Sequence, residues 1–104
     1  MDFEFDELKR EFLAEARAKV DEIGTSLRQE SSAAFERMTY LAHQLKGAGG
    51  SYGYQKISTE AAALETTLER MSGAGSPEIM GKLQNHVRVL AEEIETRSAE
   101  LSAT

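Results

Sequence analysis

Apolar residues recur at steps of three and four in four separate stretches of this chain. An α-helix turns once every 3.6 residues, so this spacing places the apolar side chains of each stretch on one face. The members are Leu8, Phe12, Ala16, Val20, Ile23 and Leu27, then Phe35, Met38, Leu41, Leu45 and Ala48, then Ile57, Ala61, Leu64, Leu68 and Met71, and last Ile79, Leu83, Val87, Leu90 and Ile94. The stripes predict four amphipathic helices, at roughly residues 5–29, 33–50, 54–72 and 77–100.

Cap and turn residues separate the four stripes. Ser31 and Ser32 are good N-caps for the second helix, and the glycine-rich run at 47–53 favours the end of that helix and a turn. A second run of small residues breaks the third helix. It is followed by Ser76 as an N-cap and Pro77 at the first position of the fourth helix.

The length of the chain allows one small core. With 104 residues, no strand pattern and short connections, the chain is predicted to be all-α, an antiparallel up-down-up-down four-helix bundle in which residues 1–104 form a single domain. A core of this size excludes a large enzyme with buried chemistry and leaves no room for a cofactor. The absence of Cys excludes a disulfide scaffold, a thiol nucleophile and a Cys-ligated zinc site.

The charge of the chain narrows the choice of partners. A net charge of −6 has the wrong sign for holding a phosphate backbone, so no nucleic-acid partner is expected. Surplus acidic charge keeps a small domain soluble, and we expect a monomer. The first residues are acidic where a signal peptide would be basic, and no apolar run approaches the ~20 residues of a membrane span. We therefore expect a whole, cytoplasmic protein that binds no membrane.

His43 stands apart from the core stripe of the second helix. At about 100° per residue, Leu41 and Leu45 each lie about 160° away from it around the helix axis. Lys46 falls on the same surface as His43, and Gly47 removes the side chain that would crowd the ring. An exposed imidazole with a neighbouring cation and open space can act as a nucleophile or phosphoryl carrier. Periodicity alone would also allow a surface His without function.

The sequence around His43 carries a further signal. The run Ala-His-Gln-Leu-Lys-Gly at residues 42–47, followed by Gly53, resembles the signature of histidine-containing phosphotransfer (HPt) domains. The resemblance implies that His43 is phosphorylated on Nε2 by a sensor histidine kinase, hybrid kinases included, or by a phosphorylated receiver domain. It implies transfer to an Asp of a response-regulator receiver domain in a two-component phosphorelay. The chain would then be a carrier and not an enzyme, without a cofactor of its own, while the receiver supplies a divalent metal.

The same resemblance assigns roles to three other residues. It implies that Lys46 steadies the phosphoryl oxygens and that Gly47 leaves space for the docked partner. Glu65, on the third helix, is expected within hydrogen-bond reach of His43 Nδ1, where it would orient the ring and leave Nε2 free to attack phosphorus. A Glu at this position is more similar to the phosphotransfer domains of chemotaxis-type kinases than to most relay shuttles.

Two alternative functions remain open from the sequence. In the first, the bundle is a non-catalytic helical adaptor or dimerisation module and His43 has no role. In the second, the chain is the phosphotransfer segment of a larger chemotaxis-type histidine kinase. The docking surface expected for a receiver domain is the exposed part of the first two helices around His43.

The remaining candidate residues are interpreted as structural. His86 borders the core stripe of the fourth helix, where a packed or flanking His is expected rather than a second carrier. The two His residues lack further ligands for a metal, and the glycine run lacks the spacing of nucleotide-binding loops. Tyr52 and Tyr54 are expected to pack at the turn. Phe3 and Phe5 are expected to cap the bundle, and it remains open whether this Phe pair also contributes to the surface on which a partner docks.

Overall fold

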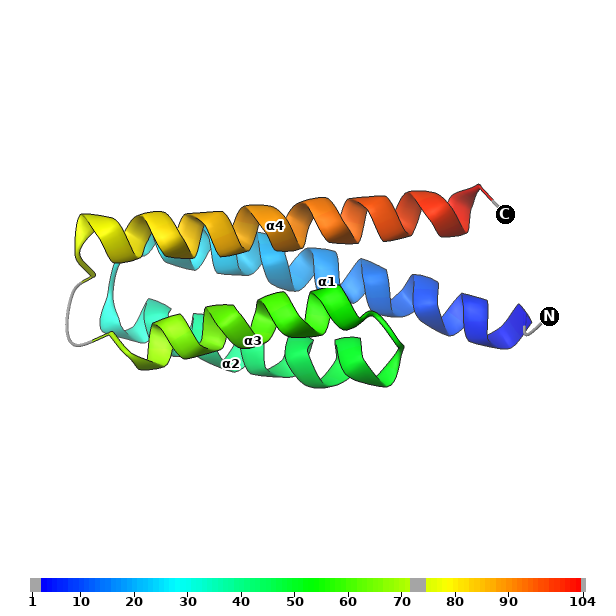
Figure 1. Ribbon diagram of the computed structural model, residues 1–104, viewed down its shortest axis with the longest axis horizontal. Coiled ribbons are helices and arrows are strands. Elements are labelled where there is room, and N and C mark those ends of the chain that lie inside the picture. Colours follow the sequence, from blue (N-terminus) through cyan, green and yellow to red (C-terminus); the bar gives the residue numbers. More distant parts are fainter. Residues whose placement is uncertain (1–2, 72–74, 104) are drawn as a thin grey trace.

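A computed structural model describes residues 3–71 and 75–103, except for the side chain of Phe3. The helices are α1 (Phe3–Gln29), α2 (Ser32–Ser51), α3 (Gln55–Glu69) and α4 (Pro77–Ser102). They lie side by side in a bundle of 48 × 20 × 18 Å, with both chain ends at the same end of the bundle (Figure 1). No strand occurs within the described ranges, so the predicted all-α class is confirmed.

The helix boundaries follow from local hydrogen bonds. Ser31 caps α2, because its side chain accepts a hydrogen bond from Ala34 N at 3.1 Å. Ser76 caps α4 in the same way through Ile79 N, and Pro77 occupies the first turn. Both of these predicted starts are confirmed.

The predicted end of the third helix is wrong. The apolar spacing predicts an end at roughly residue 72, whereas α3 ends at Glu69. The reason is visible in the backbone, since Met71 N donates to Leu68 O at 3.2 Å, a bond to the third preceding residue that tightens the final turn. Residues 72–74 of the predicted break lie outside the described part of the chain.

The four apolar stripes meet in one core. Burying this surface is the main contribution to folding free energy, at about 25 cal/mol per Å² of apolar surface. The largest of the fully buried side chains are Leu13, Ile23, Met38, Leu41, Leu45, Ile57, Leu64, Leu83, Leu90 and Ile94.

Leu8, the first member of the first stripe, lies outside the core. Its exposed fraction is 46%. Both α1 and α4 extend beyond the turn between α2 and α3 (Figure 1), so the first turns of α1 have fewer helices against which to pack. The assignment of Leu8 to the core stripe is therefore wrong.

Aromatic rings close the bundle at the turn between α2 and α3. The Tyr52 ring stacks on Phe12 with 5.0 Å between centroids, and Tyr54 stacks on Phe12 at 5.8 Å. Phe5 stacks on Tyr52 at 6.2 Å. The predicted packing of both tyrosines at the turn is confirmed, and so is the capping position of Phe5; the side chain of Phe3 lies outside the described part.

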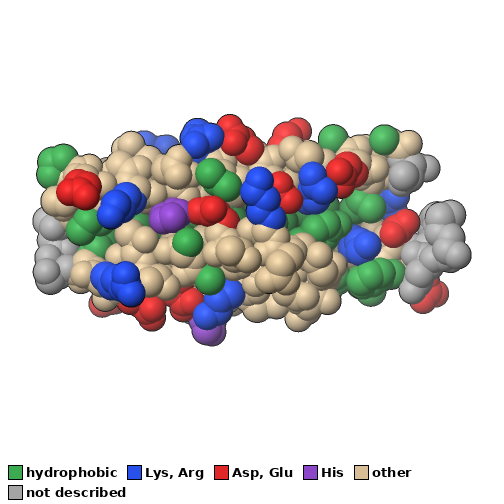
Figure 2. Space-filling view, viewed as in Figure 1, with side chains coloured by type: hydrophobic (Ala, Val, Ile, Leu, Met, Phe, Trp, Pro, Cys, Tyr) green, Lys and Arg blue, Asp and Glu red, His purple; other side chains and the backbone are tan. Residues whose placement is uncertain are grey.

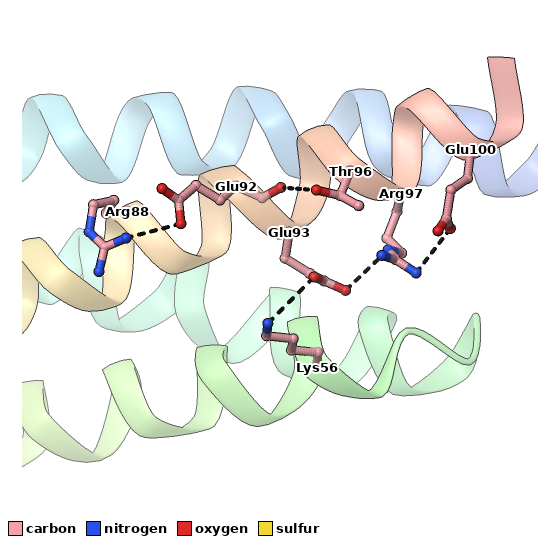
Figure 3. Close-up of polar contacts among 7 residues, drawn as sticks. All are labelled: Lys56, Arg88, Glu92, Glu93, Thr96, Arg97 and Glu100. Atoms are coloured by element: carbon pink, nitrogen blue, oxygen red, sulfur yellow. Dashed lines mark hydrogen bonds and ion pairs between the residues drawn. The ribbon is translucent and has the colours of Figure 1, made fainter. Parts of the chain in front are cut away.

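Ion pairs cover the face formed by α3 and α4. Lys56 of α3 lies 3.8 Å from Glu93 of α4, and Arg97 contacts both Glu93 and Glu100 (Figure 3). Charged side chains of both signs are interspersed over this face (Figure 2). Glu93 and Arg97 are partly buried, and the cost of desolvating such charges offsets much of their attraction, so the apolar core carries most of the folding energy.

Candidate functional site

His43 lies on α2 with its side chain turned to solvent. The neighbouring positions Leu41 and Leu45 are buried, which places the opposite face of the helix outside the core. The exposed fraction of the His43 side chain is 67%. The predicted exposure of this imidazole is confirmed.

Glu65 of α3 holds one nitrogen of the His43 ring. Its Oε2 atom lies 2.8 Å from His43 Nδ1, so the contact expected between these residues is present. The Glu65 side chain is only 11% exposed, because it follows the core residue Leu64 on the inner side of α3. An ionised carboxylate can only accept, so Nδ1 carries the hydrogen and, in the neutral ring, Nε2 keeps its lone pair.

Lys46 makes a contact with Glu65 that the sequence pattern does not predict. Its Nζ atom lies 2.9 Å from Glu65 Oε1, so the two oxygens of one carboxylate serve Lys46 and His43. The signal was present in the spacing, because Lys46 lies one helical turn after His43 and any carboxylate that reaches one is close to the other.

The charge of Glu65 is favoured by both neighbours. The hydrogen bond from the Lys46 ammonium, assisted by that from His43 and opposed by partial burial, lowers the pKa of the Glu65 carboxyl below its ordinary value of 4.5. Glu65 is therefore ionised at neutral pH and can accept hydrogen bonds from both side chains.

Gly47 leaves the surface beside His43 open. A Cβ atom built at Gly47 would have nothing within 4 Å. It lies four residues after His43, on the same side of α2. The space predicted from the sequence is present, and another protein can approach the ring across it.

If His43 accepts a phosphoryl group, as the resemblance to HPt domains implies, Gly47→Gln is expected to slow that transfer while keeping the fold. Helix stability should rise, because Gly costs a helix about 1 kcal/mol relative to Ala, whereas the new side chain would fill the open approach. Transfer kinetics and thermal unfolding measure the two effects. Gly81→Gln is a matched control, since Gly81 of α4 is equally open and lies outside the site. Equal transfer rates in both variants would place the approach of the partner elsewhere.

His86 lies on α4 and takes no part in this site. Its ring nitrogens contact Glu60 Oε2 and Thr67 Oγ1, both on α3. The side chain is 19% exposed, so the predicted packed or flanking position is confirmed.

Neither a metal cluster nor a membrane helix is found in the described part of the chain. No three His, Asp or Glu side chains there converge as metal ligands. None of the helices within residues 3–71 and 75–103 is both long and apolar enough to cross a bilayer.

Comparison with known proteins agrees with the geometry around His43. The family model described as Hpt domain matches residues 7–100. No curated protein and no solved structure matches the chain. The matched range holds the exposed His43, its partner Glu65 and all but the ends of the four-helix bundle. With a family match over nearly its whole length, the chain belongs to the Hpt domain family.

Proposed function

We propose that this protein carries a phosphoryl group on His43 Nε2 and exchanges it with an Asp of a response-regulator receiver domain. Hpt domains act in phosphotransfer within two-component systems, as carriers that interact with histidine kinases and response regulators. The observation that carries the proposal is the exposed ring whose Nδ1 is held by Glu65 at 2.8 Å, which leaves Nε2 facing solvent.

The chemical step needs a nucleophilic nitrogen and stabilisation of charge. The Nε2 lone pair attacks the phosphorus of an aspartyl phosphate, an N–P bond forms as the O–P bond breaks, and the Asp carboxylate leaves with the electron pair. The ring then carries positive charge, which the Glu65 carboxylate offsets through Nδ1–H. The divalent metal expected in the receiver would neutralise phosphoryl charge from the other side.

Lys46→Ala is expected to slow this transfer partially, by roughly tenfold. The ammonium would help to neutralise the phosphoryl oxygens, and it also fixes Glu65 through the 2.9 Å contact. Rapid-quench transfer assays measure the effect. Lys82→Ala serves as the control, because it also removes an exposed Lys, but one that lies on α4. Complete inactivity of a folded Lys46→Ala variant would show that Lys46 has a larger role than charge assistance.

The proposed docking surface lies on α1 and α2 beside His43. The large exposed hydrophobic side chains of the described residues are Phe5, Leu8 and Tyr40, all on these two helices. A shallow groove of about 380 Å³ runs between the helices and includes Tyr40. The groove, with charged residues of both signs in its lining, and the opening at Gly47 would together receive the partner beside an accessible nucleophile.

Residues 1–104 would form one monomeric, cytoplasmic domain with an antiparallel order of helices. The pairing of His43 with Glu65 and of Lys46 with Ser58 supports this order, because residue numbers rise along α2 while they fall along α3. The upstream partner would be a sensor histidine kinase, hybrid kinases included.

Incubation with a phosphorylated receiver domain tests the function. We expect the label to move to His43, detected by mass spectrometry as an acid-labile, base-stable modification, since a phosphoramidate hydrolyses when its nitrogen is protonated. A helical adaptor would bind a partner without taking up phosphate. Absence of label with every receiver domain of the host would refute the carrier function.

A further inference from the structure

A second contact between α2 and α3 lies close to the site. Ser58 Oγ of α3 donates a hydrogen bond to the backbone oxygen of Lys46 at 2.8 Å. Ser58 is partly buried and the bond crosses from one helix to the other. Lys46 is therefore held by α3 twice, at its carbonyl by Ser58 and at its ammonium by Glu65.

Close packing of the two helices makes this contact possible. A Cβ atom at Gly49 would lie only 3.2 Å from Ser58 N and 3.3 Å from Ile57 Cγ2. The chain returns through a tight turn with Gly53 at φ 81°, and Tyr54 N donates to Gly49 O at 2.8 Å. The start of α3 is thus fixed against the last turns of α2.

The position of Ser58 on α3 connects this contact to the ring. Ser58 and Glu65 are seven residues apart, close to two helical turns, so they lie on one side of α3 about 10 Å apart. An α-helix is stiff over this distance. A rotation or slide of α3 at Ser58 therefore moves the Glu65 carboxylate relative to His43, whose hydrogen bond weakens beyond about 3.2 Å.

We propose that Ser58 is a positioning residue for the reaction at His43. Its hydroxyl, together with the close approach at Gly49, sets the register of α3 against α2 and so keeps Glu65 on Nδ1. The consequence for transfer rate rests on the proposed function. The consequence for the ring itself does not, because it concerns the unphosphorylated protein.

The test compares Ser58→Ala with the wild-type protein by ¹⁵N NMR of the His43 ring at neutral pH. The wild-type ring should be the Nδ1–H tautomer, and Ser58→Ala should shift the ¹⁵N signals toward a mixture with the Nε2–H tautomer. Transfer from a phosphorylated receiver should slow about fivefold, the rate equivalent of one lost hydrogen bond. Ser58→Thr, which keeps a hydroxyl, should restore both readouts.

Ser51→Ala is the matched control. Ser51 Oγ also donates to a backbone oxygen of α2, that of Gly47 at 3.1 Å, but this bond stays within one helix. Ring signals that are unchanged in Ser58→Ala, or changed equally in Ser51→Ala, would overturn the proposal. If no receiver phosphorylates the wild-type protein, the carrier function fails while the ring signals still decide the role of Ser58.

Neighbouring glycines supply a second pair of variants for the ring signals. A Cβ at Gly49 would lie 3.2 Å from Ser58 N, so α3 would have to give by a few tenths of an ångström, whereas a Cβ at Gly50 would meet Ser58 Oγ at an ordinary 3.6 Å. We expect the tautomer shift in Gly49→Ala and not in Gly50→Ala, although both add the same methyl group. The reverse order, or no difference between them, would contradict the proposed control of register.

Discussion

His43→Gln is expected to abolish phosphorylation of this protein. Gln has no ring nitrogen that can form an N–P bond, and the other imidazole of the chain is engaged by Glu60 and Thr67 on α3. The loss should be complete rather than partial, because the residue removed is the nucleophile itself. Phosphate transfer from a labelled receiver, followed by mapping of the modified residue, measures the effect.

His86→Gln is the control for this substitution. It should leave labelling near the wild-type level, since His86 lies outside the site. The free energy of unfolding should change by no more than about 0.5 kcal/mol in His43→Gln, as is usual for an exposed side chain. Phosphate found on His86, or retained in His43→Gln, would show that the site is wrongly assigned.

The helices and the exposure of His43 could be predicted because both depend on local periodicity. A spacing of three and four residues determines which side of α2 faces the core, and His43 falls on the other side. The contact between His43 and Glu65 could be predicted only from the resemblance to HPt domains. Spacing within one helix does not indicate which residue of another helix lies opposite.

Contacts that depend on the relative placement of helices were missed. The Lys46 carbonyl meets Ser58 because Gly49 lets α2 and α3 approach closely, and neither the distance nor the partner follows from the pattern of one helix. Leu8 fits the stripe of α1 but lies beyond the turn at which α2 ends and α3 begins, so fewer helices pack against it. In both cases tertiary context, and not helix propensity, decides the outcome.

Glu65→Gln is expected to slow phosphorylation of His43 by about tenfold, by analogy with the low end of the range for changed partners of metal-ligating His residues. The amide oxygen can still accept from Nδ1–H, but the negative charge that offsets the ring after transfer is lost. Glu65→Ala should slow the reaction further, because the ring then loses its partner. Transfer kinetics measure the slower reaction, and the ¹⁵N signals of His43 show whether the ring has lost its partner.

Glu65→Gln should also change how the free energy of unfolding depends on pH. The pKa of Glu65 in the folded protein is lowered, first by Lys46 and then by His43, so its ionised form favours folding above the ordinary value of 4.5. That contribution is lost as the pH falls through the lowered folded value. Denaturant unfolding should therefore show wild type more stable than Glu65→Gln at neutral pH, with the difference shrinking in acid. Glu69→Gln, an exposed change one turn further along α3, should follow wild type. Parallel pH curves for wild type and Glu65→Gln would mean that the shared carboxylate does not stabilise the fold through its charge.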